Sequence, residues 1–390
     1  MLDHVAQLAA DPGSLSRRDS LARALLMAGA AGDAKLDEAA AALLSLATAA
    51  MPVTAAAEFA LAARKNYAMV PVWFATDRQA TGETAPARQF GTARAAVSYG
   101  RCEISIPREH RMGELESRSL LRLEFRDNPA KHVLLLKTEL QQREAFFTDL
   151  GRRLRASPPG HALLFVHGYN VSFEDAARRT GQMAYDLGFD GAPVFYSWPS
   201  QASLSGYLED EANIEWSQAN LGLFLRDFLQ RTDATHIYLI AHSMGNRALT
   251  RALAQVLAEQ PQAAARIREI ILTAPDIDAD VFRRDIVPAL AGAANPITLY
   301  ASSEDIALAA SKRIHGYPRA GDSGSGMVVM DGVETIDATG VDTSFIKHSY
   351  FASRRSTLGD MYYLINNNTR AADRFGLQFQ AAGRYWTFKK

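Results

Sequence analysis

Short apolar runs alternate with longer amphipathic stretches along most of the chain. The apolar runs are typical of parallel strands buried on both faces, and Ala162–Val166 (ALLFV) is the clearest example. The longer stretches have helical spacing and predict helices over 139–155 and 172–187. Strands are predicted at 70–75, 95–106, 132–137, 162–166, 192–196, 236–241, 267–273, 297–301 and 333–336, with a loop over 76–91. This alternation predicts an α/β fold with a mostly parallel sheet and helices on both faces.

Residues 1–66 differ in composition from the rest. They are rich in Ala and Leu, nearly free of aromatic side chains, and show helical spacing, with Asp33 as a candidate helix cap. We expect an N-terminal helical appendage here, followed by a main domain over 67–390. The appendage either packs on that domain or binds a partner.

Composition excludes several classes of function. The chain has 42 Lys and Arg against 43 Asp and Glu, so it has no excess positive charge for phosphates, and we expect no nucleic-acid partner. Cys102 is the only cysteine, which excludes an internal disulfide and a cysteine-based metal site. No HExxH, P-loop or GxGxxG pattern occurs. We therefore expect neither a metal nor a cofactor.

The N-terminal sequence does not resemble a secretion signal, because Asp3 and Arg17 are among the charges that interrupt its apolar residues. The longest uncharged stretch, 39–57, is mostly alanine and contains Pro52, which makes it a poor membrane span. We expect no integral membrane span. The single cysteine and the lack of a signal predict a cytoplasmic location.

The sharpest local motif follows the predicted strand 236–241. The chain continues as His242-Ser243-Met244-Gly245 and then takes on a helical pattern. A nucleophile elbow places a serine in a tight turn between a strand and a helix, with small residues two positions away on either side. Ala241 and Gly245 meet that need, and the helix N-terminus favours developing negative charge. Ser243 is the predicted nucleophile.

A second motif, His167-Gly168-Tyr169-Asn170, follows the buried strand 162–166. A loop in this position supplies one donor of an oxyanion hole, and the residue after the nucleophile supplies the other. We predict the backbone N–H groups of Tyr169 and Met244 as these donors. His167 and Asn170 either support the loop or contact the substrate.

A serine hydroxyl needs a histidine to take its proton and a carboxylate to orient that histidine. With a nucleophile elbow, the chain order is serine, acid, histidine. Only His315 and His348 follow Ser243, and His348 lies beyond the last predicted strand, where the base is expected. We therefore predict His348 as the base.

Two carboxylates are candidates for the acid. Asp305 follows the penultimate strand, 297–301, which is the usual position, and it is the predicted acid. Asp276 follows the strand 267–273 and is the alternative; otherwise it caps the next helix or shapes the pocket.

The segment 199–219 contains serine, aromatic and acidic residues and follows a predicted strand. One interpretation is a lid, in which Tyr207, Asp210, Glu211 and Trp216 line a substrate entrance. The other is a loop and the start of a helix.

Several of these motifs together resemble the bacterial α/β-hydrolases grouped as domain of unknown function 900, some of which are esterases. The resemblance covers about 70–351. The matching stretches are FATDR at 74–78, YG at 99–100, ISIP at 104–107, FVHGYN at 165–170, YSWPS at 196–200, AHSMGNR at 241–247, APDID at 274–278 and HSYF at 348–351. The resemblance implies the α/β-hydrolase fold and a Ser–Asp–His hydrolase.

The leading hypothesis is a serine hydrolase that cleaves a small carboxylic ester through an acyl-enzyme, without a cofactor. An acyltransferase, a thioesterase or a lipase would use the same triad. A non-catalytic protein that binds a partner through residues 1–66 is the alternative of another class.

Overall fold

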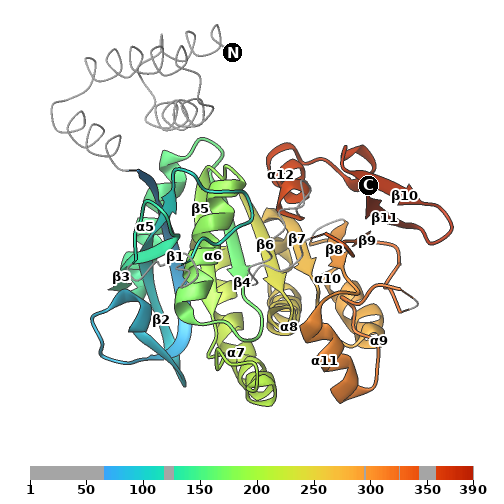
Figure 1. The fold of residues 1–390 in the computed structure, drawn as a ribbon, viewed down its shortest axis with the longest axis horizontal. Coiled ribbons are helices and arrows are strands. Elements are labelled where there is room, and N and C mark those ends of the chain that lie inside the picture. The colour runs from blue at the N-terminus through green and yellow to red at the C-terminus, as the bar shows by residue number, and fades with distance from the viewer. Residues whose placement is uncertain (1–65, 118–126, 294–295, 325, 342–356, 390) are drawn as a thin grey trace, which may run out of the picture.

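The computed structural model describes residues 66–117, 127–293, 296–324, 326–341 and 357–389. One sheet of 11 strands passes through this part of the chain, in the order β10-β11-β9-β8-β7-β6-β4-β5-β1-β2-β3 (Figure 1). The strands are β1 (Tyr67–Ala80), β2 (Phe90–Pro107), β3 (Leu134–Gln141), β4 (His161–Val166), β5 (Gly191–Ser197), β6 (His236–His242), β7 (Ile267–Thr273), β8 (Ile297–Ala301), β9 (Val333–Asp337), β10 (Leu377–Gln380) and β11 (Tyr385–Phe388).

The described helices connect these strands. They are α5 (Arg143–Ala156), α6 (Phe173–Asp186), α7 (Tyr207–Arg231), α8 (Gly245–Glu259), α9 (Ala279–Val281), α10 (Val287–Leu290), α11 (Ile306–His315) and α12 (Thr357–Asn367). A π-helical turn, Phe282–Ile286, joins α9 to α10. Among the described helices, none combines the length and the apolar composition that a membrane span needs.

Neighbouring strands are parallel from β11 across to β1, and antiparallel pairs complete both ends of the sheet. Val166 at the end of β4 pairs with Ala241 near the end of β6. His242 in turn pairs with Thr273 at the end of β7. The loops that follow β4, β6 and β7 therefore leave the sheet side by side at its carboxyl edge, where open α/β sheets bind their ligands.

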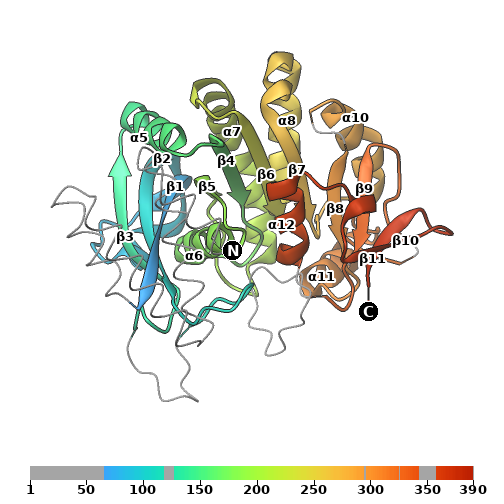
Figure 2. The ribbon, with the colours of Figure 1, turned by 90° about the horizontal axis from the view of Figure 1, so that it is seen from above.

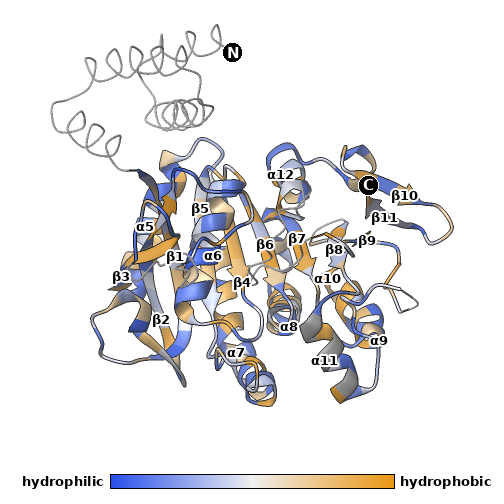
Figure 3. Cartoon of the chain, in the orientation of Figure 1, coloured by the Kyte–Doolittle hydropathy of each residue, from blue (hydrophilic) through white to orange (hydrophobic). Residues whose placement is uncertain are grey.

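Helices cover both faces of the sheet. Figure 2 shows α5, α7, α8 and α10 on one face and α6 and α12 on the other. A separate apolar core fills each face: Phe224 and Leu253 belong to the first, and Phe173 and Met183 to the second. The central strands β4, β6 and β7 are mostly hydrophobic (Figure 3), which explains why their apolar runs could be recognised in the sequence.

The predicted strands and helices are confirmed with small changes of boundary. The predicted loop 76–91 is partly wrong, because β1 continues to Ala80 and β2 begins at Phe90, with Ala80 and Phe90 paired at the end of a long ribbon. The helix predicted from 139 begins at Arg143, because Glu139 still belongs to β3. The N-terminal helical appendage over 1–66, including Asp33, lies outside the described residues except for its last position.

The segment 199–219 is a short loop followed by the first half of α7. Its buried side chains include Asp210, Asn213 and Ser217, and the Asn213 amide donates to the Pro199 carbonyl (2.8 Å). The segment is therefore packed against the sheet, which matches the loop-and-helix interpretation and gives no support to a separate lid.

Candidate active site

Ser243 lies in the turn between β6 and α8 with the left-handed backbone expected of an elbow, φ 48°. A non-glycine residue in that region is strained by on the order of 1–3 kcal/mol. Backbone hydrogen bonds hold it there: the Ser243 N–H donates to the Thr273 carbonyl (2.9 Å), and the Ser243 carbonyl accepts from the Asn246 amide (2.8 Å). The strain is therefore fixed by β7 and by the first turn of α8.

Two glycines allow the 167–170 loop to pack directly on this turn. A Cβ at Gly245 would lie 2.3 Å from the His167 carbonyl oxygen. A Cβ at Gly168 would lie 2.8 Å from His242 Nδ1 and 2.9 Å from Ser243 Cβ. Neither distance is sterically possible, so the loop and the elbow meet only because both positions lack a side chain.

The backbone N–H groups of Tyr169 and Met244 have no acceptor among the described residues. Their neighbours in the first loop do: the Asn170 N–H donates to Asp210 Oδ2 (3.1 Å) and the Val171 N–H to Ser200 Oγ (3.1 Å). Met244 is also the N-cap of α8, where amides point away from the helix. Tyr169 follows Gly168, which packs on the elbow, and Met244 follows Ser243, so these two N–H groups remain the predicted oxyanion-hole donors.

His167 is buried within its own loop. One ring nitrogen, Nδ1, lies 2.8 Å from the Gly168 carbonyl, the other, Nε2, lies 3.1 Å from Ser197 Oγ, and the ring stacks on Trp198 at 5.0 Å. Burial, together with the nearby charge of Arg78, holds the pKa of His167 well below its usual range. A neutral, enclosed imidazole fits the loop-supporting alternative better than substrate contact.

Asn170 also has a left-handed backbone, φ 58°. Asparagine tolerates this conformation better than most residues, and its bond to Asp210 holds the turn in place. Its side chain is half-buried, so substrate contact by Asn170 stays a prediction.

Asp276, the alternative acid, is enclosed in a polar cluster. Its Oδ2 accepts from the Tyr207 hydroxyl (2.7 Å) and from Arg247 (3.0 Å), and its Oδ1 accepts from Arg319 (2.8 Å) and from the Ser311 hydroxyl. Burial opposes ionisation, but the two guanidinium groups and the hydroxyls outweigh it and lower the pKa of Asp276. Each oxygen already has two donors, which leaves no position for a catalytic imidazole.

The cluster supports the elbow from below, because the Asp276 N–H donates to the Ser243 carbonyl (3.2 Å). The cap of α9 is a different residue, Asp278, which accepts from the N–H groups of Asp280 and Val281. Asp276 therefore shapes the floor of the site.

Asp305 follows β8 and caps α11, where its Oδ1 accepts from the Leu308 N–H (2.9 Å). No described residue donates to its Oδ2, and the side chain is half-buried. Asp305 is close enough to the elbow to act on His242: burial lowers the pKa of His242 to about 4, and the Asp305 charge opposes that shift. The charge of Asp305 therefore acts on the elbow, and its Oδ2 has no donor among the described residues.

The structure describes only one of the two candidate bases, His315. His348 lies outside the described residues, so its role stays a prediction. His315, at the end of α11, is held on both sides: Nδ1 lies 2.8 Å from the Ser311 carbonyl and Nε2 lies 2.8 Å from Glu211 Oε1. Neither nitrogen is free to take a proton from Ser243 in this arrangement.

The residues predicted at a substrate entrance make contacts with other protein groups, and their contact with a substrate stays a prediction. Tyr207 is buried, with its ring 5.4 Å from the Tyr169 ring, and burial raises the pKa of its hydroxyl. Asp210 is fully buried and faces the 167–171 loop instead of solvent. Trp216 lies on α7 beneath the Arg94 guanidinium, 5.3 Å from it. Tyr207 and Asp210 therefore contact residues next to the elbow, whereas Trp216 contacts β2; Glu211 is partly exposed.

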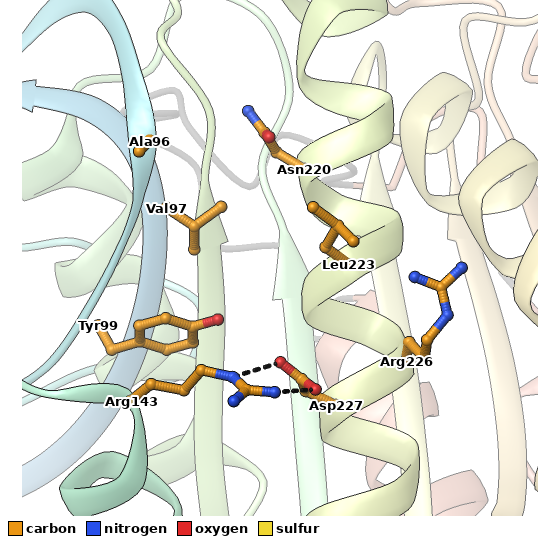
Figure 4. A pocket seen from close by; sticks show the side chains of 8 residues that line it. All are labelled: Ala96, Val97, Tyr99, Arg143, Asn220, Leu223, Arg226 and Asp227. Carbon is orange, nitrogen blue, oxygen red and sulfur yellow. Dashed lines mark hydrogen bonds and ion pairs between the residues drawn. The ribbon is translucent and has the colours of Figure 1, made fainter.

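A cleft of about 380 Å³ lies on the α5 and α7 face of the sheet (Figure 4). Its wall includes a bidentate ion pair between Arg143 and Asp227, at 2.8 and 2.6 Å. The lining residues are Ala96, Val97, Tyr99, Arg143, Asn220, Leu223, Arg226 and Asp227. None of them was predicted as a site residue, and none belongs to the loops that surround Ser243.

The residues that hold the 167–171 turn, above all Arg78 and Ser200, were not predicted from the sequence. Both lie in stretches that carried the family resemblance, FATDR and YSWPS. That was the available signal, but it assigned them no role.

A comparison with known families agrees with this fold. A family model described as "Alpha/beta hydrolase of unknown function" (DUF900) matches residues 142–366, more than half of the chain. None of the curated proteins compared with the chain matches it significantly.

Solved structures give distant likenesses. One, described as a cell surface hydrolase of Lactobacillus plantarum, is 15% identical with a TM-score of 0.33, over 53% of this chain and 90% of the other. Lipase B of Aspergillus fumigatus is 13% identical with a TM-score of 0.28, over 48% of each chain. Both structures are too dissimilar from this chain to indicate its activity.

Proposed function

The chain belongs to the alpha/beta hydrolase family whose model matches residues 142–366, and we propose that it is a serine hydrolase that cleaves carboxylic esters of small molecules. The observation that carries this proposal is the strained turn at Ser243, next to the backbone N–H groups of Tyr169 and Met244, which have no acceptor within the described part of the chain. Strain of this kind at a buried turn is characteristic of catalytic sites.

In the proposed reaction, the Ser243 hydroxyl attacks the acyl carbon while His348 takes its proton. The negative charge that develops on the carbonyl oxygen is stabilised by the N–H groups of Tyr169 and Met244. His348 then gives the proton to the departing alcohol, and an acyl group remains on Ser243. Water, activated by the same histidine, releases the acid.

Asp305 is the proposed acid of the triad, which orients His348 and stabilises its protonated form. The contacts of the two carboxylates support this choice over Asp276. The carboxylate of Asp276 accepts four hydrogen bonds, two on each oxygen. That of Asp305 accepts a described hydrogen bond on one oxygen only, and Asp305 follows β8, the strand adjacent to β7.

The test is hydrolysis of p-nitrophenyl esters from acetate to palmitate by the wild type and by Ser243→Ala. Ser205→Ala, which changes an exposed serine near the start of α7, is the matched control. We expect turnover in the wild type and the control, its loss in Ser243→Ala, and fluorophosphonate labelling that maps to Ser243. Turnover that survives in Ser243→Ala would contradict the proposal, and a maximum at long chains would favour a lipase.

A further inference from the structure

Arg78 is a buried arginine whose guanidinium group meets only neutral acceptors. It lies within β1, two residues before the end of the strand, and 1% of the residue is exposed. Its four hydrogen bonds are to the Ser197 hydroxyl (2.8 Å) and to the carbonyls of Val171 (2.7 Å), Ser200 (3.0 Å) and Gly91 (3.1 Å). Burial lowers the pKa of Arg78 to about 10, and nearby carboxylates oppose that shift. None of the described carboxylates forms an ion pair with it.

Asp210 is the negative counterpart on the other side of the same loop. It is fully buried on α7, and it accepts from the Asn170 N–H (3.1 Å), the Ser200 hydroxyl (2.5 Å) and the Gln201 N–H (2.6 Å). Within the described part of the chain it has no cationic partner in direct contact.

Ser200 joins the two charges. Its carbonyl accepts from Arg78, and its hydroxyl donates to Asp210 while it accepts from the Val171 N–H (3.1 Å). A buried charge that meets only neutral partners is usually costly to the fold. Its presence here is therefore poorly explained by stability alone.

The hydrogen bonds around Arg78, Ser200 and Asp210 converge on one short turn. Asn170 and Val171 are held through their N–H groups, Val171 also through its carbonyl, and His167 through Ser197. Two amides between these fixed points, those of Gly168 and Tyr169, have no acceptor among the described residues, and that of Tyr169 is the predicted oxyanion-hole donor.

We propose that Arg78 and Asp210, linked through Ser200, are positioning residues that fix the 167–171 turn so that the Tyr169 N–H points at the oxyanion. This inference rests on the proposed ester hydrolysis. It adds two charged residues that act through the loop and do not touch the substrate.

The test uses two mild variants and a matched control. Arg78→Lys keeps the positive charge but loses the fork of donors, and Ser200→Ala removes the link to Asp210. The control is Arg266→Lys, because Arg266 also donates to backbone carbonyls, those of Leu229, Thr232 and Ala234, but at the amino edge of the sheet. Each variant is assayed for kcat and KM with p-nitrophenyl acetate and for amide hydrogen exchange at 168–171.

We expect kcat to fall by roughly 10- to 100-fold in Arg78→Lys and Ser200→Ala with KM changed less than about threefold, because a misplaced donor weakens transition-state binding. Arg266→Lys keeps kcat even where its melting temperature falls. Unchanged kcat in both test variants would overturn the inference.

Hydrogen exchange separates this inference from the proposed function. If wild-type turnover survives Ser243→Ala, the proposed function fails, but exchange at 168–171 still decides whether the turn is held as described. Faster exchange in Arg78→Lys and Ser200→Ala than in Arg266→Lys supports the positioning role. Equal exchange in all three variants refutes it.

Discussion

Replacing each candidate acid by asparagine separates catalysis from stability. Asp276 neutralises Arg247 and Arg319 in a buried cluster and accepts four hydrogen bonds. In Asp276→Asn one oxygen becomes an amide donor that faces other donors. Arg319 loses its counter-charge, and Arg247 keeps only its ion pair with Glu211. Asp305 is only half-buried, and its one described contact is the helix cap at Leu308.

We expect Asp276→Asn to lose mainly stability and Asp305→Asn to lose mainly activity. Removing one partner of a buried ion pair costs about 3–5 kcal/mol, which corresponds to a fall in melting temperature of roughly 5–10 °C for Asp276→Asn. Asparagine caps helices about as well as aspartate, so Asp305→Asn should change the melting temperature by less than about 2 °C. If Asp305 orients the base, its replacement lowers kcat by about 10⁴-fold.

Thermal melts and ester hydrolysis at a temperature where both variants are folded measure the two effects. We expect Asp276→Asn to be the less stable variant, with a smaller loss of kcat. The reasoning is refuted if Asp305→Asn keeps activity within about tenfold of the wild type while folded Asp276→Asn is inactive, since triad members act as a unit.

Two further predictions concern histidines. The imidazole of His110 lies between the carboxylates of Glu116 and Asp186; burial disfavours its charge, but these contacts raise its pKa to about 9. Its stabilising contribution is complete below its unfolded pKa of about 6.5 and is lost as pH rises through 9, so melting temperatures of His110→Gln and wild type should differ at pH 6 and converge near pH 10. For the base, His348→Ala should lose nearly all turnover and His315→Ala should keep most of it, and wild-type kcat/KM should rise with pH through about 6.5; the reverse order of the two variants would move the base to His315.

The sequence predicts the central sheet well because strands buried on both faces are continuous apolar runs. The hairpin of β10 and β11 was not predicted, since its two strands have four residues each and are too short to show a clear pattern. The ends of β1 and β2 were predicted as loop because their polar, glycine-containing sequence gives no strand signal, although the two strands pair there.

Some residues of the candidate site could likewise be predicted from the sequence, and others could not. Ser243 and the loop at Tyr169 could be located because an elbow needs small residues at fixed spacing. The choice between Asp276 and Asp305 could not be derived in this way, because both follow a parallel strand. What separates them is the set of donors around Asp276, which come from residues 207, 247, 311 and 319. Charged residues are expected at the surface, so the burial of Arg78 could not be predicted either.

Backbone strain is concentrated where the three central strands end. Asn170 after β4, Ser243 after β6 and Ala274 directly after β7 all have positive φ, at 58°, 48° and 44°. Each is held by a bond from outside its own turn: Asn170 by Asp210, Ser243 by the Thr273 carbonyl, and Ala274 through its N–H to the Tyr300 carbonyl (2.8 Å). At about 1–3 kcal/mol for each strained residue, this edge opposes folding by an amount comparable to a large part of the net stability of a domain. Selection for stability alone would relax such positions, so their concentration around Ser243 is better explained by a reaction that needs these turns held in place.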